Sequence, residues 1–187
     1  MNRRHFLLGT GAALAAGGGI ASAQLRHAST DAPASVTALQ QRWKDLLAPG
    51  AEVAADSTPI TRTDAEWRSR LSPLAYDVLR HEGTERPWSS PLDAEKRPGV
   101  FVCAGCSLPL FSSAMKFDSG TGWPSFFTTI PGAFATKVDT KLIVPRTEYH
   151  CVKCGGHQGH VFDDGPRPTG LRYCNDGVAL RFIPAHA

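Results

Sequence analysis

Two Cys-x-x-Cys pairs constrain this 187-residue chain more than any other feature of its sequence. The first pair is Cys103 and Cys106, and the second is Cys151 and Cys154. Each such turn lets two thiolates reach one ion at about 2.3 Å, so the two turns together predict a tetrahedral zinc site. This closed shell leaves no position for water, which makes the site structural. The alternatives are two disulfides or a redox-active pair, and the spacing favours zinc over both.

A fifth cysteine, Cys174, remains without a partner. A leftover thiol can be a nucleophile or an intermolecular partner, but a buried structural cysteine is equally common. Arg172 would share a strand face with Cys174, where its guanidinium would lower the pKa of the thiol. His157 and His160 lie just upstream and could supply protons, because four thiolates already fill the zinc shell.

Aromatic residues gather in the glycine- and proline-rich segment SGTGWPSF. Trp123 and Phe126 could form the wall of a pocket for a small apolar group. Either residue could equally belong to an ordinary core. The occurrence of this segment together with a lone thiol and two histidines indicates a catalytic site.

Residues 1–23 have the pattern of an export signal. A basic start with Arg3 and Arg4 precedes a stretch rich in glycine and alanine, and Ala21-Ser22-Ala23 is a small-residue cleavage site. The paired arginines favour a twin-arginine signal over an ordinary secretory signal. We therefore expect export to the periplasm by the twin-arginine pathway. That pathway carries folded proteins, which reconciles a zinc–thiolate site with an oxidising compartment.

The charge of the chain argues against several kinds of partner. The formal net charge is +3, and removal of a signal with two arginines and no acidic residue lowers it to +1. This excess is too small for a nucleic-acid-binding zinc ribbon. Glycines also interrupt the run of about 20 apolar residues that a membrane span needs. We expect a monomer with no nucleic-acid partner and no stable membrane association.

Short helices are predicted before the cysteine pairs. Residues 24–60 would hold a polar linker and one helix, over 36–48. Thr63-Asp64-Ala65-Glu66 is a capping box that opens a second helix, and Ser72-Pro73 opens a third. The residues expected on the inner side of the third helix are Leu74, Val78 and Leu79.

From Gly99 onward the pattern changes to short strands. Turn signals at Asp139-Thr140 and Asn175-Asp176-Gly177 separate several of them, and the last strand is expected over Val178–Ile183. Residues 61–187 therefore form a mainly β domain, an antiparallel body with N-terminal helical decoration.

A series of motifs in this domain resembles the type B methionine sulfoxide reductases. The motifs, in the order of that family, are GTERPW, CAGCSLPLF, KFDSGTGWPSF, RTEYHCVKCGGHQGHVFDDGPRPTGLRYC and ALRF. The resemblance runs from about Arg62 to Pro184. It implies two antiparallel sheets in a tent-like arrangement, and it matches the two cysteine pairs to the structural zinc site of many members.

The resemblance also implies a reaction. Cys174 would attack the sulfur of a methionine R-sulfoxide, in a protein or as the free residue, and would be left as a sulfenic acid. His157, His160 and Arg172 match active-site positions, and Asp164 matches an acidic position that supports them.

Other residues would bind the substrate. Trp123 matches the aromatic wall that receives the methyl group of the sulfoxide, and Phe126 and Asp176 would also contact the substrate. An outside thiol, such as a thioredoxin-like protein, would reduce the sulfenic acid. The biological role implied is the repair of proteins under oxidative stress.

Two positions depart from the family pattern. Asp176 stands where members usually carry asparagine, and a carboxylate there would raise the pKa of Cys174. Thr121 stands where many members have a resolving cysteine, so no internal thiol remains to reduce a sulfenic acid. The alternative function is a zinc-stabilised β binding module that has lost catalytic power, and Asp176 is the residue that supports it.

Overall fold

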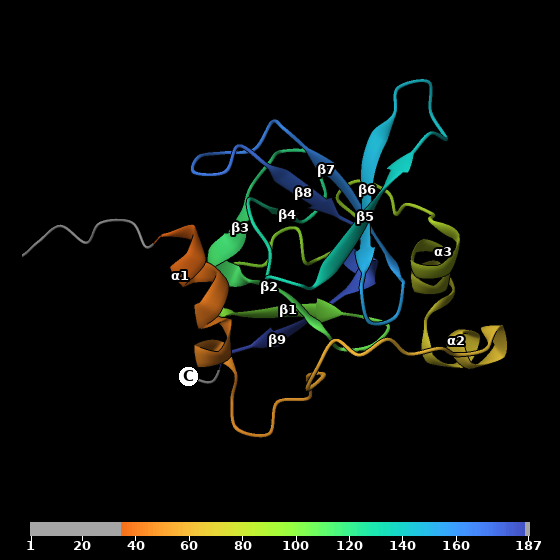
Figure 1. Ribbon diagram of the computed structural model, residues 1–187, viewed down its shortest axis with the longest axis horizontal. Coiled ribbons are helices and arrows are strands. Elements are labelled where there is room, and N and C mark those ends of the chain that lie inside the picture. Colours follow the sequence, from red (N-terminus) through yellow and green to blue (C-terminus); the bar gives the residue numbers. More distant parts are fainter. Residues whose placement is uncertain (1–34, 186–187) are drawn as a thin grey trace, which may run out of the picture. The chain divides into compact units, whose positions relative to one another are not determined.

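The computed structural model describes residues 35–185. Two antiparallel sheets and a few short helices make up this part of the chain, so the predicted mainly β class is confirmed (Figure 1). The predicted signal, residues 1–23, and the first part of the predicted linker lie outside the described residues. Over 35–185, no helix is long and apolar enough to cross a membrane.

The α-helices precede the sheets, as predicted. The helices and the short 3₁₀ turns (η) are α1 (Val36–Gln41), η1 (Arg42–Leu46), α2 (Asp64–Arg70), α3 (Pro73–His81), η2 (Ser113–Met115) and η3 (Gly177–Ala179). The predicted capping box forms at the start of α2, where Thr63 Oγ1 accepts from Glu66 N and the Glu66 carboxylate accepts from Thr63 N. Ser72 caps α3 through Ala75 N.

Two helical predictions are wrong in detail. The helix expected over 36–48 is α-helical only to Gln41 and continues as η1, because its residues are at most partly buried and packing does not enforce a regular α-helix. Leu74 is exposed, and Ala75 and Tyr76 take the inner positions of α3. The hydroxyl of Tyr76 donates to the Asp64 carboxylate, which fixes the rotation of α3 against α2.

The segment before α2 packs on the rest of the fold. Trp43, Ala54 and Ile60 contact the core. Ala54 N donates to Ser107 O (2.9 Å), beside the first Cys-x-x-Cys turn, and Ile60 N donates to Lys153 O (2.7 Å), within the second. This part of the predicted linker therefore lies against both cysteine turns.

The smaller sheet has the strand order β2-β1-β9. Its strands are β1 (Gly99–Cys103), β2 (Pro109–Ser112) and β9 (Leu180–Pro184). The strand expected over Val178–Ile183 begins two residues late, because the carboxylate of Glu85 accepts from Gly177 N and Val178 N. These two amides are therefore not available to a neighbouring strand, and the segment forms η3.

The larger sheet has the strand order β3-β4-β8-β7-β6-β5. Its strands are β3 (Lys116–Phe117), β4 (Ser125–Phe126), β5 (Phe134–Asp139), β6 (Arg146–Cys151), β7 (His157–Phe162) and β8 (Arg172–Asn175). All pairs are antiparallel. The strand β5 lies at one edge, and the chain from β5 to β6 projects as a hairpin (Figure 1).

Aromatic side chains from both sheets meet in the core, and Phe126 is one of them. The rings of Phe126 and Phe111 stack with centroids 3.9 Å apart, and Phe101 meets Phe126 edge-on at 5.0 Å. Phe126 is fully buried, so its predicted role in substrate binding is wrong. The reason is strand alternation: Ser125 is the β4 residue paired with Cys174, and Phe126 points to the opposite face.

Truncation of Phe126 tests this core position. We expect Phe126→Ala to lower the free energy of unfolding by about 3–5 kcal/mol, because the deletion removes the contacts with Phe111 and leaves a cavity. Urea denaturation measures the change. The control Val138→Ala removes an exposed side chain and should change stability by less than about 0.5 kcal/mol. A loss of stability no larger than that of the control would contradict the core placement.

Candidate functional site

The candidate site lies on one face of the larger sheet. Cys174 on β8 pairs with His160 on β7, and His160 pairs with Glu148 on β6. Directly paired residues of antiparallel strands project from the same face, so the three side chains stand side by side. Arg172 pairs with Phe162 on this face, which confirms the predicted common face of Arg172 and Cys174.

A cavity of about 130 Å³ opens beside Cys174. Trp123, His160 and Asp176, all predicted site residues, line it together with Cys174. This volume holds about four water molecules, or the end of a thioether side chain. Trp123 forms part of the wall and is held by a hydrogen bond from its Nε1 to Glu85 O (3.2 Å).

The thiol of Cys174 experiences opposing influences. Burial raises its pKa most strongly, and the carboxylate of Asp176 adds to that rise. The guanidinium of Arg172 and the hydroxyl of Thr121 lower it, but burial outweighs them and the pKa lies above its ordinary value. The predicted effect of Arg172 is therefore present, and it is not large enough to make the thiolate the resting form.

The charge of Arg172 is shared with Asp164. Arg172 Nε lies 2.7 Å from Asp164 Oδ1 and Nη2 lies 2.8 Å from Oδ2, a two-point ion pair. The guanidinium also lies 4.4 Å from the ring centre of Phe162. Asp164 is exposed and does not line the cavity, and it contacts the site through Arg172.

His160 lies in the cavity wall with a carboxylate behind it. Its Nε2 lies 2.8 Å from Asp139 Oδ2, and Asp139 in turn accepts from Arg146 Nη2 at 2.5 Å. Burial lowers the pKa of His160, and Asp139 offsets this only in part. The ring is thus held in one orientation beside Cys174.

His157 lies deeper than His160 and does not line the cavity. Its Nδ1 lies 2.7 Å from Glu148 Oε1, and its buried Nε2 has no hydrogen-bond partner. That nitrogen is 3.9 Å from Asp176 Oδ2. Burial tends to raise the pKa of Glu148, but His157 and His150 outweigh it and lower the pKa.

Asp176 is buried under the segment that contains Glu85. Asp176 Oδ1 accepts from Glu85 N at 2.9 Å. Burial raises the pKa of Asp176 to about 7, despite that hydrogen bond. Glu85 therefore contacts three parts of the site, namely Asp176, the wall residue Trp123, and the backbone of η3.

Sequence reasoning missed four residues of the site, which are Asp139, Arg146, Glu148 and Glu85. The signal for Arg146 and Glu148 was present in RTEYHC, where alternate polar residues indicate one face of a strand. Glu85 belongs to the motif GTERPW. The sequence could not show that this motif reaches the site, because its contacts there are with residues distant in the chain.

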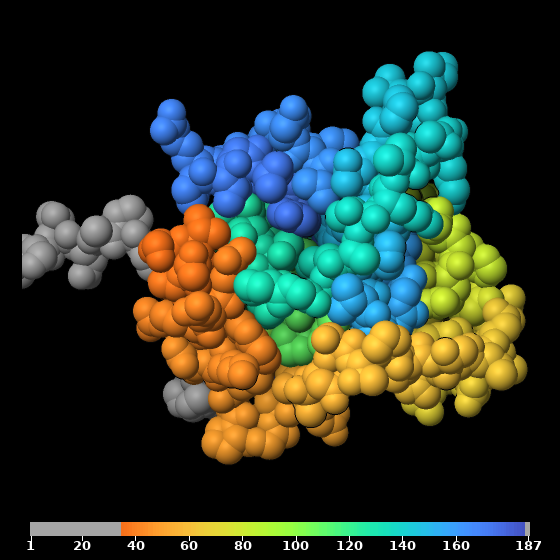
Figure 2. Space-filling view, in the orientation of Figure 1, coloured from red at the N-terminus to blue at the C-terminus, as the bar shows by residue number. Residues whose placement is uncertain are grey.

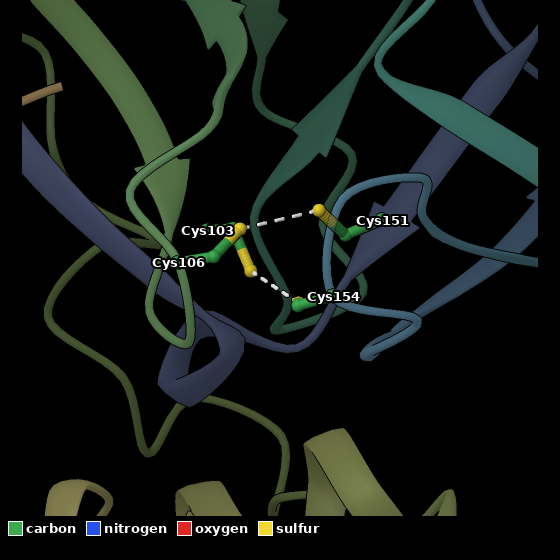
Figure 3. A group of neighbouring side chains, drawn as sticks. All are labelled: Cys103, Cys106, Cys151 and Cys154. Carbon is green, nitrogen blue, oxygen red and sulfur yellow. Dashed lines mark hydrogen bonds between the residues drawn. The ribbon is translucent and has the colours of Figure 1, made fainter. Parts of the chain in front are cut away.

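The four paired cysteines converge from two turns (Figure 3). Their sulfur atoms lie within 4.8 Å of one another, with Cys106 and Cys151 at 3.5 Å and Cys103 and Cys154 at 3.6 Å. All five cysteines are free thiols. Tetrahedral coordination at about 2.3 Å separates sulfurs by about 3.8 Å, so the cluster fits a metal ion such as zinc.

The surroundings of the cluster also fit an ion held by thiolates. Gln158 Nε2 donates to Cys103 Sγ at 3.4 Å, and Arg80 Nη1 donates to Cys154 O at 2.8 Å. A donor such as Gln158 stabilises the charge of a thiolate ligand, and Arg80 holds the backbone of the second turn. The cluster is separate from the cavity beside Cys174, which is the one cysteine that does not belong to it.

Comparisons with known proteins agree with this geometry. The SelR domain matches residues 71–184. A peptide methionine sulfoxide reductase MsrB of Agrobacterium fabrum is 48% identical over 129 residues, which cover 68% of this chain and 96% of the relative. The MsrB of Leifsonia xyli is 51% identical over 127 residues (67% and 91%), and that of Methanosarcina barkeri 49% over 124 residues (66% and 87%). The chain therefore belongs to the MsrB family of peptide methionine sulfoxide reductases, and it is an enzyme of that family.

Proposed function

We propose that this enzyme reduces the R epimer of methionine sulfoxide to methionine, through a sulfenic acid on Cys174. The observation that carries the proposal is the lone thiol in a small cavity, with His160 directly across the strand pair and Trp123 in the wall. The names of the relatives supply the substrate class. The epimer preference comes from the family resemblance.

The residues of the cavity have separate roles in this proposal. Trp123 packs against the methyl group, and the Cys174 thiolate attacks the sulfoxide sulfur. The sulfoxide oxygen leaves as water after it takes up two protons, one from His160, which Asp139 orients, and one from solvent. Water then returns an oxygen to the cysteine sulfur as methionine departs. One proton is released again when water attacks the cysteine sulfur. In sum, a thiolate, a proton and a sulfoxide give a sulfenic acid and methionine.

An outside thiol completes the cycle. The other four cysteines are gathered in the cluster, and Thr121 lies beside Cys174 where a resolving cysteine would be needed. Two external thiols therefore convert the sulfenic acid to the Cys174 thiol, with release of a disulfide and water. A thioredoxin-like protein or a small thiol can supply them. Residues 1–23 would direct export by the twin-arginine pathway, a proposal that the sequence pattern supports.

In this proposal the cluster holds one zinc ion, with Cys103, Cys106, Cys151 and Cys154 as its ligands. All four positions of a tetrahedral ion are then filled by protein, so the ion takes no part in the reaction and ties the two turns together. The sulfur separations and the donors around the cluster support this role.

One prediction concerns the reaction itself. Wild-type protein with a thiol reductant should reduce the R epimer of a dabsylated methionine sulfoxide and leave the S epimer, and Cys174→Ser should lose turnover to background. Mass spectrometry after one turnover without reductant should find one added oxygen on Cys174. Turnover by Cys174→Ser would exclude Cys174 as the nucleophile, and an internal disulfide would contradict the step with an outside thiol.

Another prediction concerns Asp176, which gains its negative charge as the pH rises through about 7. That charge opposes formation of the Cys174 thiolate, so Asp176→Asn should move the alkylation midpoint of Cys174 to lower pH, by about one unit. Peptide mass spectrometry can follow Cys174 separately from the other cysteines. Asp163→Asn, which removes an exposed charge, is the control and should leave the midpoint in place.

The alkylation and turnover of Asp176→Asn also distinguish the two candidate functions. Identical alkylation profiles for the wild type and Asp176→Asn would exclude an electrostatic effect of this carboxylate. Wild-type protein without turnover, in which Asp176→Asn restores activity, would instead support the alternative of a β binding module that has lost catalytic power.

A further prediction concerns the metal. Purified protein should contain one zinc ion per chain, and removal with a strong chelator should lower the melting temperature, because ligand binding free energy contributes to folding. Cys151→Ser should lose zinc and stability, whereas Cys174→Ser should retain both. Equal zinc contents in the two variants would show that the cluster is not the metal site.

A further inference from the structure

The hairpin between β5 and β6 exposes aliphatic side chains that the proposed chemistry does not use. Their exposures are 71% for Val138, 57% for Leu142, 103% for Ile143 and 71% for Val144. Figure 2 shows the segment standing out from the surface, in cyan at the upper right. We call these four residues the hairpin patch. Monomeric proteins rarely expose contiguous apolar residues in this way unless the surface has a binding function.

The base of this hairpin is part of the candidate site. Asp139, the last residue of β5, accepts from Arg146, the first residue of β6, and also contacts His160. Arg146 lines the cavity beside Cys174. Residues 142–144 precede Arg146 by two to four positions, which places them at most about 13 Å from it along an extended chain. The patch therefore lies within a few residues of the cavity wall along the chain.

The hairpin is anchored to the end of α3 through its lysines. Lys141 is the one charged residue of 140–145. Its Nζ lies 2.7 Å from Glu82 Oε2, at the end of α3, and Lys137 contacts the other oxygen of that carboxylate. Lys141 therefore turns toward Glu82, and the exposed side chains of 142–145 are all apolar.

The size of the cavity indicates what reaches the patch. A volume of about 130 Å³ admits the end of one side chain, so the rest of a polypeptide substrate remains outside. An extended chain advances about 3.3 Å per residue, so residues three or four positions from the oxidised methionine reach the tip. Methionines are mostly buried among other apolar residues, and unfolding exposes these neighbours along with them. A single amino acid is too short to span this distance.

We propose that the hairpin patch is a docking surface for the apolar residues that flank an oxidised methionine in an unfolded polypeptide. This inference rests on the proposed function and adds a second contact outside the cavity. The patch contributes to the binding of a polypeptide and contributes nothing to the binding of a single residue. It is therefore a specificity determinant that the cavity residues do not provide.

Two substrates and two variants test the docking surface. The triple variant Leu142→Ser/Ile143→Ser/Val144→Ser removes most of the patch, and Leu74→Ser removes an exposed leucine of α3 as the matched control. The substrates are peroxide-oxidised β-casein, which is unfolded, and N-acetyl-methionine sulfoxide. Circular dichroism and zinc content check that each variant is folded.

The expected result separates the two substrates. The triple variant should lose at least about tenfold in kcat/KM on oxidised casein, from the lost burial of apolar side chains, and should change less than twofold on N-acetyl-methionine sulfoxide. Leu74→Ser should act as the wild type on both substrates.

Other outcomes would overturn the proposal. An equal loss on both substrates, or no loss on casein, would exclude the docking surface while the proposed function stands. A wild type that is a dimer in sedimentation, with a monomeric triple variant, would show that the patch contacts a second copy instead. A wild type that reduces neither substrate would overturn the proposed function and the docking surface with it.

Discussion

The buried side chain of Gln158 joins the cysteine cluster to the strand that carries Cys174. Its Nε2 donates to Cys103 Sγ, its Oε1 accepts from Asn175 Nδ2 (3.3 Å), and its backbone oxygen accepts from Asp176 N (2.9 Å). Asn175 Oδ1 also accepts from the hydroxyl of Tyr149 at 2.8 Å. Since each of these groups is buried, none can exchange its partner for water without a substantial cost.

This connection makes the position of Cys174 depend on the cluster. A shift of the first cysteine turn would leave Gln158 without an acceptor or would move Asn175, the residue next to Cys174. The segment 35–60 adds to this dependence from the other side, since its backbone donates to both cysteine turns. The cluster thus helps to position the strand that carries Cys174 without contributing an atom to the cavity.

The cavity itself disfavours charge. Burial raises the pKa of both Cys174 and Asp176, and the compensating groups are at its margin. Arg172 offers a positive charge that Asp164 already shares, and His160 has a lowered pKa. A site of this kind favours the neutral forms of Cys174, Asp176 and His160, so the thiolate and the imidazolium that the proposed reaction uses must form when substrate enters.

Local patterns in the sequence predicted the features that depend on a few neighbouring residues. The cysteine pairs, the capping box at Thr63, and the common face of Arg172 and Cys174 are of this kind, because each follows from spacing along the chain. The partners of His160 and His157 could not be predicted, because Asp139 and Glu148 reach them only through the pairing of strands. Phe126 was misplaced for a related reason, since a two-residue strand offers too little alternation to show which face is inside.

The hydrogen bonds of Glu85 determine which side chains can be replaced in the turn that follows Cys174. Glu85 binds the backbone amides of Gly177 and Val178 and no side chain there, so the shape of the turn is set independently of residue identity. Gly177 is still restricted, because a Cβ there would lie 2.1 Å from Ser90 Oγ. Val178 is only partly buried, so its side chain can be replaced to change the surroundings of Cys174 while the backbone of the turn is kept.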